Sequence, residues 1–217
     1  LVRDQVHFLG NYSLAIIAVS GLFVGFVLSL QGYYTLQRYG SSEALGLLVA
    51  LSLVRELGPV LVGLMIAARV TSSIAAEIAT MKVTEQIDAL VTLSTNPMKY
   101  LTVPRVIAGF LTVPLLVGIG DVIGIMGGFL VSTEQLGFNR ASYIKNTIDF
   151  LETADVVSSL IKGAVFGFIA TLIGCYYGMN SGRGAQGVGG ATKNAVAAAS
   201  ILILAANFIL TSVMFGS

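Results

Sequence analysis

The sequence predicts an all-α integral membrane protein with about five transmembrane helices. Of its 217 residues, 55% are hydrophobic and only 11% are charged, whereas soluble domains carry roughly 25% charged residues. The mean hydropathy is +0.87. A helix needs about 20 apolar residues to cross a bilayer, so this length suits five spans with short connections. We predict one membrane domain over residues 1–217, with no soluble catalytic domain.

The five predicted spans are residues 12–36, 44–68, 105–131, 156–177 and 195–215. In the first, Gly21 and Gly25 form a small-xxx-small ridge that allows another helix to approach closely. Tyr33, Tyr34 and Tyr39 end this span as an aromatic belt typical of the membrane interface.

The second span carries a charged pair in its middle. Arg55 and Glu56 lie near the bilayer midplane if residues 44–68 form one helix, at ~1.5 Å per residue across a core of ~30 Å. A charge there costs roughly 2.5 kcal/mol or more, so both should face protein or water. Adjacent helical residues diverge by about 100°, so each should have its own partner. Pro59 cannot bond to the carbonyl of Arg55, four residues back. We expect function at this depth, with a purely structural pair as the alternative.

The connection after the second span contains a short amphipathic segment. At residues 82–91 the apolar side chains recur at helical spacing, and Glu85 and Asp88 lie on the opposite face. We predict one helix here. Two interpretations stay open: an interfacial loop helix, or a docking helix that presents its two acids to a cytosolic partner.

The third and fourth spans are rich in glycine, and the last three spans are poor in charge. Glycines repeat every four residues in two of them, which favours close helix packing. Asp121 is the one acid of the third span; a helix-packing hydrogen bond is its expected role and a proton relay the alternative. We expect a polar segment at residues 132–155 and a glycine-rich loop at 179–194. The fifth span is interrupted only by Asn207.

Lys and Arg in the connections predict the orientation. One side holds Arg3, Arg69, Lys82, Lys99, Arg105, Arg183 and Lys193, and the other holds Arg38, Arg140, Lys145 and Lys162. The richer side should be cytoplasmic. This orientation places residues 82–91 in the cytoplasm.

Several function classes are disfavoured. A net charge of +1 offers no basic surface for nucleic acid. With one cysteine, Cys175, and one histidine, His7, we predict no metal site and no disulfide framework. Residues 182–187, GRGAQG, have the spacing of a dinucleotide fingerprint but follow a membrane span, so we predict a flexible loop. An intramembrane hydrolase needs a nucleophile and base together, which the scattered acids do not offer.

Two longer motifs carry a family resemblance. LSLVRELGPV at residues 51–60 and AARVTSSIAAEIATMKVTEQIDAL at 67–90 are similar to the MlaE (YrbE) permease family. QGY at 31–33 and LTSVMFG at 210–216 fit the same family, so the resemblance covers nearly the whole chain. The family's N-terminal interfacial helix is absent, and the first residue is Leu1 rather than Met, so we expect residues to be missing before it.

The resemblance implies a homodimeric permease of an ABC-type transporter that moves phospholipid between the inner and outer membranes of Gram-negative bacteria. The implied partners are a cytosolic ABC ATPase, periplasmic MCE-domain lipid-binding subunits and a possible STAS-domain protein. By the same resemblance, Glu85 and Asp88, with Lys82 and Gln86 beside them, belong to a coupling helix that docks on the ATPase. The implied location is the bacterial inner membrane, with several passes.

The resemblance also implies a lipid site near Arg55, Glu56 and Tyr33. A lipid pocket should be mostly apolar with few polar groups. Spans one and two offer such a lining, with Leu22 and Leu30 on the first, and Arg55 is suited to bind a phosphate. Asn207 stands where some relatives have an acid, so a charge-based role is not expected there.

The energy source separates two hypotheses. The chain has no Gly-x-x-x-x-Gly-Lys-Ser/Thr loop, so we predict no cofactor and no enzymatic activity in this chain, with ATP and Mg²⁺ bound by the partner ATPase. The alternative is an ion- or proton-coupled secondary carrier that uses Glu56 and Asp121. Transport that depends on a proton gradient and is unaffected by loss of the ATPase would favour that carrier.

Overall fold

The computed structural model describes residues 2–40 and 44–216, and every regular element within them is a helix. Five of these helices are long and apolar enough to cross a membrane: Val2–Arg38, Leu45–Val83, Met98–Glu134, Thr153–Met179 and Gly184–Phe215. The predicted fold class and the five spans are therefore confirmed. Each helix is longer than its predicted span, because hydropathy marks the apolar part of a helix and not its polar ends.

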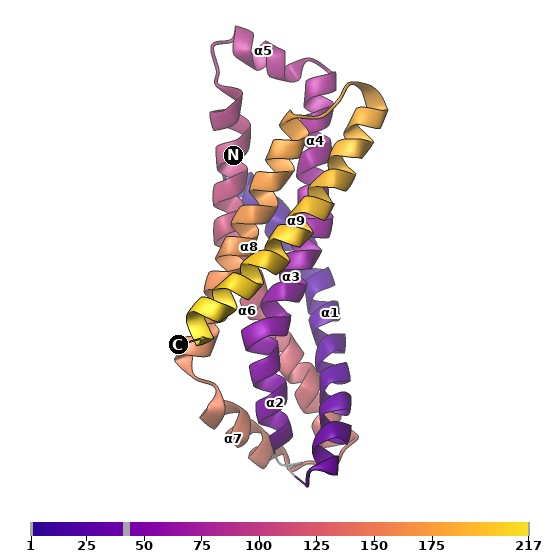
Figure 1. Ribbon diagram of the computed structural model, residues 1–217, viewed down its shortest axis with the longest axis vertical. Helices are drawn as coiled ribbons and strands as arrows, with labels where there is room; N and C mark the ends of the chain where they lie inside the picture. The colour runs from indigo at the N-terminus through magenta and orange to yellow at the C-terminus, as the bar shows by residue number, and fades with distance from the viewer. Residues whose placement is uncertain (1, 41–43, 217) are drawn as a thin grey trace.

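The second and third long helices contain π-turns, labelled η. The elements are α1 (Val2–Arg38), α2 (Leu45–Ser52), η2 (Leu53–Leu57), α3 (Gly58–Ile66), η3 (Ala67–Thr71), α4 (Ser72–Val83), α5 (Gln86–Thr92), η4 (Met98–Thr102), α6 (Val103–Glu134), α7 (Arg140–Phe150), α8 (Thr153–Met179) and α9 (Gly184–Phe215). The long helices run along one axis, with α5 at one end and α7 at the other, and α9 crosses the bundle diagonally (Figure 1).

Helices α1 and α6 pack backbone against backbone. A Cβ atom placed on Gly25 would lie 2.0 Å from the Gly124 carbonyl oxygen, and one on Gly21 would lie 3.0 Å from the Gly120 oxygen. Ser29 adds a hydrogen bond across the same contact, from its hydroxyl to the Gly128 carbonyl, at 3.1 Å. The glycine ridges predicted in the first and third spans therefore face each other.

We expect Gly25→Ala to destabilise the protein, because the added methyl group would collide with the backbone of α6. Overpacking of this kind costs about 1–3 kcal/mol, so the thermal midpoint of the detergent-solubilised protein should fall measurably. Gly189→Ala is the matched control, since Gly189 is also helical and a Cβ there has no atom within 4 Å. Equal midpoints for the two variants would contradict the close α1–α6 contact.

The glycines of the fourth span also serve packing within this chain. A Cβ on Gly167 of α8 would lie 2.3 Å from the Gly109 oxygen of α6, and one on Gly178 would lie 2.8 Å from Ile78 of α4. Helix α8 is therefore pressed between α6 and α4. This contact places the polar residues of α8 beside the second span.

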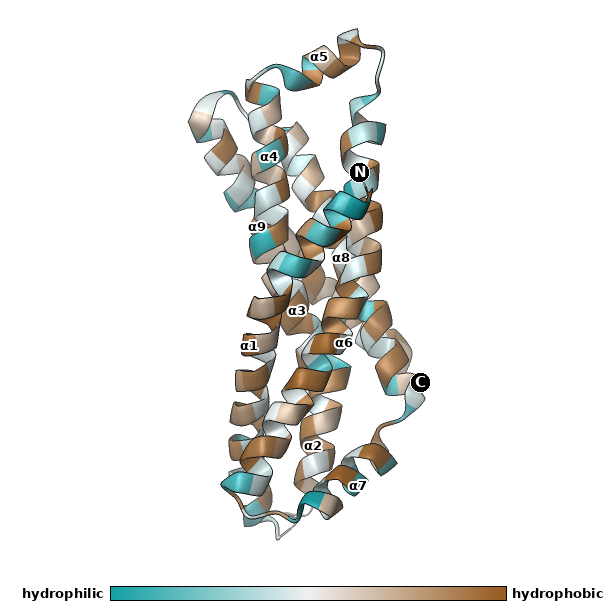
Figure 2. Cartoon of the chain, turned by 180° about the vertical axis from the view of Figure 1, so that it is seen from behind, coloured by the Kyte–Doolittle hydropathy of each residue, from teal (hydrophilic) through white to brown (hydrophobic). Residues whose placement is uncertain are grey.

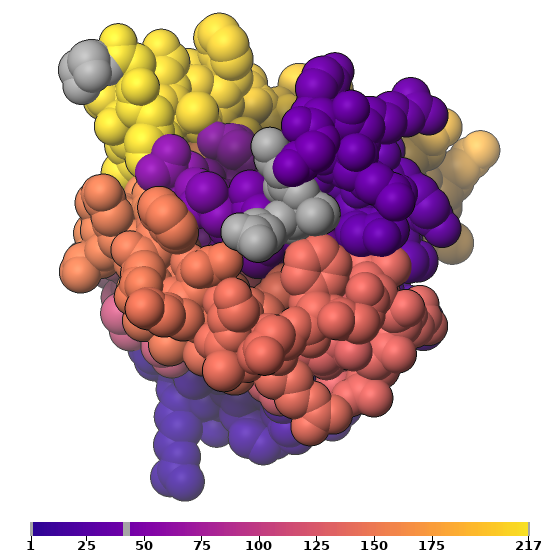
Figure 3. All heavy atoms as spheres, turned by 90° about the horizontal axis from the view of Figure 1, so that it is seen from below, coloured from indigo at the N-terminus to yellow at the C-terminus, as the bar shows by residue number. Residues whose placement is uncertain are grey.

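Helix α7 lies across one end of the bundle. The Asn139 side chain caps its first turn by accepting from the backbone N–H groups of Ala141 and Ser142. Tyr143 packs edge-on against Phe129, and its burial raises the pKa of the Tyr143 phenol. Seen from this end, α7 and the first turns of α8 lie in front of α2 (Figure 3).

The outer surface is apolar along the middle of the long helices. Figure 2 shows hydrophilic residues toward the α5 end and on the first turns of α1, and again at the opposite end around α7. Helix α9 is the least covered span, with 11% of its most apolar window buried, against 50% for the second span. The exposed face of α9 includes Phe208 and Val213. Lipid or another protein must cover this face.

The glycine-rich loop expected at residues 179–194 is mostly helix. Helix α9 starts at Gly184, whose φ is +73°, so the predicted flexible loop is wrong from that residue onward. Glycine disfavours a helix by about 1 kcal/mol per residue. Here Ala191 and Ala195 are buried against neighbouring helices. Tertiary packing of this kind outweighs the weak local propensity.

Candidate functional site

A π-turn widens the second span at its charged pair. Across η2, the N–H of Gly58 bonds to the carbonyl of Leu53, five residues back. Pro59 follows with no N–H to donate, so the Arg55 carbonyl is left for another donor. Irregular turns inside helices occur frequently at functional sites.

Lys162 of α8 supplies that donor. Its side chain is fully buried, and its ammonium donates to the Arg55 carbonyl at 2.6 Å, the Glu56 Oε1 atom at 2.9 Å and the Thr211 hydroxyl at 2.8 Å. An ammonium has three N–H groups, and all three are used. The buried charge is therefore both paired and fully hydrogen-bonded, as an intramembrane charge requires.

Glu56 joins the second span to α9 as well as to α8. Its Oε1 atom also accepts from the Thr211 hydroxyl at 2.7 Å, and its Oε2 atom accepts from the Asn207 amide at 2.8 Å. Asn207, the one polar interruption of the last span, thus binds the carboxylate. The Glu56 side chain is nevertheless 38% exposed, so part of it lies at the surface of the chain.

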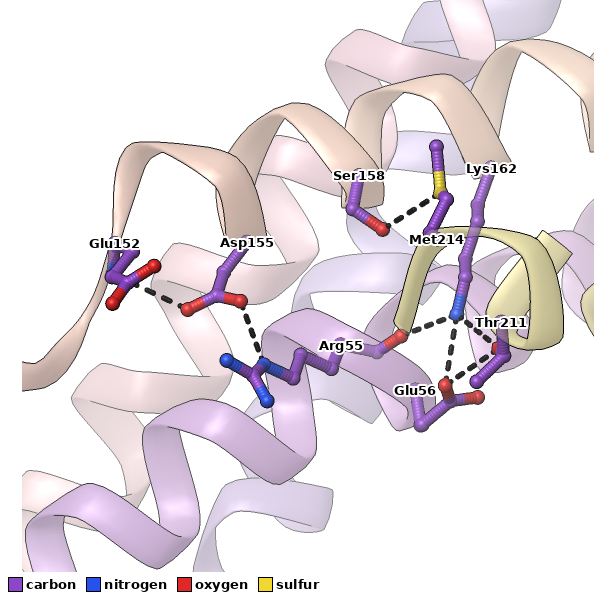
Figure 4. A network of polar contacts seen from close by, with 8 residues as sticks. All are labelled: Arg55, Glu56, Glu152, Asp155, Ser158, Lys162, Thr211 and Met214. Atoms are coloured by element: carbon purple, nitrogen blue, oxygen red, sulfur yellow. Dashed lines mark hydrogen bonds and ion pairs between the residues drawn. The ribbon is translucent and has the colours of Figure 1, made fainter. Parts of the chain in front are cut away.

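Arg55 points to a separate partner, Asp155, at the start of α8. Its Nε atom lies 2.6 Å from Asp155 Oδ1 (Figure 4). Its guanidinium lies over the Phe215 ring, 4.9 Å from the ring centre. Asp155 is 1% exposed, whereas the Arg55 side chain is 38% exposed. The prediction that Arg55 and Glu56 have different partners is confirmed. Part of the guanidinium stays open for a ligand.

Asp121 lies apart from this network. Its Oδ2 atom accepts from the Ser159 hydroxyl at 2.6 Å, which joins α6 to α8. Its Oδ1 atom is buried with no hydrogen-bond partner in the described residues, beside Gly58. This agrees with the expected helix-packing hydrogen bond. None of the described hydrogen bonds joins Asp121 to Glu56.

The other predicted lipid-site residues lie along α1. Tyr33 packs against a cluster formed by Leu45, Val49 and Leu53, with its ring edge-on to Phe138 at 6.0 Å. The backbone of Leu22 faces Gly127 of α6, and Leu30 lines a shallow surface pocket of about 470 Å³ near the end of α1. The described residues show no hydrogen bond or ion pair between these three and Arg55 or Glu56. Their role in lipid binding stays a prediction.

The predicted helix at residues 82–91 is divided. Helix α4 ends at Val83 and α5 begins at Gln86, because Glu85 adopts a left-handed conformation with φ of 60°. The Lys82 ammonium bonds to the carbonyls of Met179 and Ser181 at 2.8 and 2.9 Å. These bonds fix the end of α4 to the α8–α9 connection, so the chain turns there instead of continuing as one helix.

Helix α5 leaves its side chains largely free. None of its residues is fully buried, and Ile87 alone packs partly against the main core. A surface pocket of about 470 Å³ lies beside it, with Glu85, Asp88 and Arg183 in its lining. Lys82 also lines this pocket, so this end of the bundle offers an open surface with charges of both signs, on which Glu85 and Asp88 are the acids. Among the described residues, no group of three or more His, Cys, Asp or Glu is arranged to hold a metal ion.

The sequence analysis missed the two partners on α8. Lys162 fell inside the predicted fourth span but was counted among the charges of one membrane side, and Asp155 was assigned to a polar segment. Both belong to the membrane-spanning helix and are buried. One signal was available: Asp155, Ser158, Ser159 and Lys162 recur at helical spacing, which predicts a polar stripe on one face. Hydropathy alone does not separate such a stripe from the edge of a span.

The fold is a bundle of membrane-spanning helices whose interior holds paired charges, and some of these charged side chains are partly exposed. This combination defines a membrane transport protein. Comparison with known proteins agrees. The Permease MlaE family model matches residues 2–213, and the chain belongs to the MlaE permease family.

Three relatives illustrate the range of similarity. A "Probable ABC transporter permease protein" of Rickettsia typhi is 54% identical over 99% of this chain and 83% of the relative. The "Intermembrane phospholipid transport system permease protein MlaE" of Haemophilus influenzae is 39% identical over 100% of this chain and 84% of the relative. The chloroplastic protein TRIGALACTOSYLDIACYLGLYCEROL 1 of Arabidopsis thaliana is 35% identical over 98% of this chain and 61% of the relative.

Proposed function

We propose that this chain is the permease subunit of an ABC-type transporter that moves phospholipid between the inner and outer membranes, driven by a partner ATPase. The observation that carries the proposal is the network around Arg55, Glu56 and Lys162, which opens a cation and a carboxylate to the surface at the π-turn η2 of the second span. The family and the name of the Haemophilus relative support phospholipid as the substrate.

The proposed partner at the α5 end is a cytosolic ABC ATPase, which binds ATP and Mg²⁺. Two features support this assignment: the open position of α5, which exposes Glu85 and Asp88, and the absence of a phosphate-binding loop from the sequence. The orientation also agrees. Without the buried Lys162 and Arg105, the α5 end still has more Lys and Arg residues than the α7 end, which supports a cytoplasmic α5 end.

The proposed assembly is a homodimer in the bacterial inner membrane, with MCE-domain subunits in the periplasm and a possible STAS-domain protein. The poorly covered α9 supports a second protein beside it. Together α1 and α9 are the two least buried spans. A dimer that uses them would enclose Arg55 and Glu56, together with Tyr33, Leu22 and Leu30, in one lipid cavity.

The proposal predicts that the purified complex carries lipid and its ATPase. The tagged chain should be isolated from its native membrane, and bound proteins and lipids identified by mass spectrometry. An ABC ATPase together with phospholipid is the expected result. Isolation of the chain with neither would contradict the proposal.

Arg55→Ala should lower phospholipid transfer, since the open guanidinium would no longer bind the lipid phosphate. The measurement is ATP-driven transfer of fluorescent phospholipid from proteoliposomes that contain the complete complex. We expect a loss of about tenfold, the effect of one charge-assisted hydrogen bond.

The same change leaves Asp155 without its partner, so a second variant is needed. Arg55→Gln keeps a donor for Asp155 but removes the charge, and Lys145→Ala removes an exposed charge from α7 as the matched control. Size-exclusion chromatography should show that Arg55→Gln is folded, and this variant should still transfer phospholipid slowly. Transfer at the wild-type rate would remove Arg55 from the mechanism.

The coupled-carrier alternative has less support from the geometry. Both oxygens of Glu56 accept hydrogen bonds, and Asp121 bonds to Ser159 on a different side of the second span. A proton relay needs the two acids joined by hydrogen-bonded groups, and the described residues contain none between them.

A further inference from the structure

We propose a second phospholipid-binding site, between α1 and the π-turn η3, in which Arg69 and Ser13 bind the phosphate of a lipid in the leaflet nearer the α5 end. Arg69 lies 14 residues beyond Arg55 along the second span, about 21 Å of helix. The proposal rests on the proposed function only for the choice of a phospholipid as ligand.

Arg69 is a cation without an anionic partner. It ends the apolar run that starts at Val60, and it lies in η3, where the helix widens a second time. Its Nη1 atom is buried and makes no hydrogen bond, and the described residues contain no carboxylate paired with it. The guanidinium instead lies over the Tyr12 ring, 5.7 Å from its centre. The Arg69 side chain is only half-buried, but a buried N–H group without an acceptor is costly, and an anion in the adjacent pocket would satisfy it.

Ser13 is a second unsatisfied group at the same place. It is 3% exposed, and its hydroxyl has no partner within the described residues. A helical serine commonly bonds to the carbonyl four residues back, as Ser72 does to Ala68 in this chain. The Ser13 hydroxyl does not, so it is available to a ligand from the adjacent pocket.

Two pockets meet at these residues. One has a volume of about 180 Å³ and is lined by Phe8, Tyr12, Ser13, Arg69, Val70 and Ser73. The other has a volume of about 440 Å³ and is lined by Ser13, Ile16, Ile17, Met65, Ala68 and Arg69.

The two linings match the two parts of a phospholipid. The smaller pocket offers two hydroxyl-bearing serines, a phenol and the guanidinium, which suit a phosphate. Ile16 and Met65 lie one helical turn nearer the membrane centre than Tyr12 and Arg69, so the larger pocket suits an acyl chain. A headgroup at the interface and a chain toward the centre is the orientation of a lipid in that leaflet.

The test uses the full-length protein in nanodiscs of phosphatidylcholine, without ATP. The probe is phosphatidylglycerol with a photoreactive group on one acyl chain, and labelled peptides are mapped by mass spectrometry. We expect labelling near Ile16 and Met65. Arg69→Gln should reduce it about tenfold and Ser13→Ala about threefold, since each removes one hydrogen bond to the phosphate. Arg38→Gln, at the other end of α1, is the matched control and should leave labelling unchanged.

Two further arms identify the ligand. Diacylglycerol with the same photoreactive chain lacks the phosphate and should label these peptides weakly; equal labelling would mean ordinary boundary lipid and would overturn the proposal. Excess inorganic phosphate should not compete; loss of labelling would mean a site for free phosphate. Cross-linking of Ile16 to a second protein chain in place of lipid would also overturn it.

Each variant is checked for folding by size-exclusion chromatography. If Arg69→Gln is unfolded, Ser13→Ala decides, because unchanged labelling in that folded variant overturns the proposal. Labelling without ATP is independent of transport. Labelling as expected in a complex that fails to move lipid would contradict the proposed function alone, and transport without this labelling would contradict the second site alone.

Discussion

Lys162→Met is expected to destabilise the protein more than any other single change in the buried network. The substitution leaves Glu56 without its cation and the Arg55 carbonyl without a donor. Breaking a fully buried pair costs roughly 3–5 kcal/mol. Since Glu56 is 38% exposed, we expect about 2–3 kcal/mol here. The thermal midpoint and the membrane yield of the purified variant measure the loss.

A double substitution separates charge from packing. Lys162→Met combined with Glu56→Gln leaves no unpaired charge at this place. The double variant should recover much of the lost stability, because replacing both members of a buried ion pair by uncharged side chains often changes the free energy of unfolding little. The control is Lys193→Met, at an exposed lysine of α9. If Lys162→Met were as stable as the control, Lys162 would not hold the three helices together.

The second large effect is expected at α5. Glu85→Lys should weaken association with the ATPase about tenfold or more, since a charge pair at a docking surface becomes a like-charge contact. ATP-driven lipid transfer should fall with it, while the amount of protein in the membrane stays unchanged. Co-purification of the ATPase with the tagged permease measures the association.

The backbone at this position requires its own control. Glu85 has a positive φ, so Glu85→Gly removes the charge while the backbone stays in a conformation that glycine adopts readily. It should weaken binding less than Glu85→Lys. Asp149→Lys makes the same charge change on exposed α7, at the other end of the bundle, and should leave the association intact. Normal ATPase binding by Glu85→Lys would exclude the docking role.

The sequence by itself determined the class of protein and the place of the break in the second span. Composition and apolar length predict five membrane helices, because hydration free energy depends on local residue type and on the fixed thickness of a bilayer. The break at Arg55, Glu56 and Pro59 was also predictable, since the missing N–H of proline acts on a carbonyl only four residues away. The glycine ridges predicted close helix packing, because a residue without a side chain lets another backbone approach.

The tertiary structure decided which side chains bond to the polar groups at that break. Lys162 bonds to Arg55 and Glu56 from more than a hundred residues away, and Thr211 and Asn207 reach Glu56 from still further along the chain. Such pairings depend on how α8 and α9 are rotated and offset against the second span. The close backbone contacts at Gly167 and Gly178 set that register, and no periodicity within a single helix reports it.

The same reason accounts for the two local predictions that were wrong. Residues 184–194 are helical because α9 packs on its neighbours, and the segment 82–91 is divided because Lys82 is tied to the end of α8. Propensity is worth about 1 kcal/mol per residue or less, and contacts between distant segments outweigh it. Local chemistry thus decided which segments form membrane-spanning helices, and long-range packing decided which partners their polar residues bind.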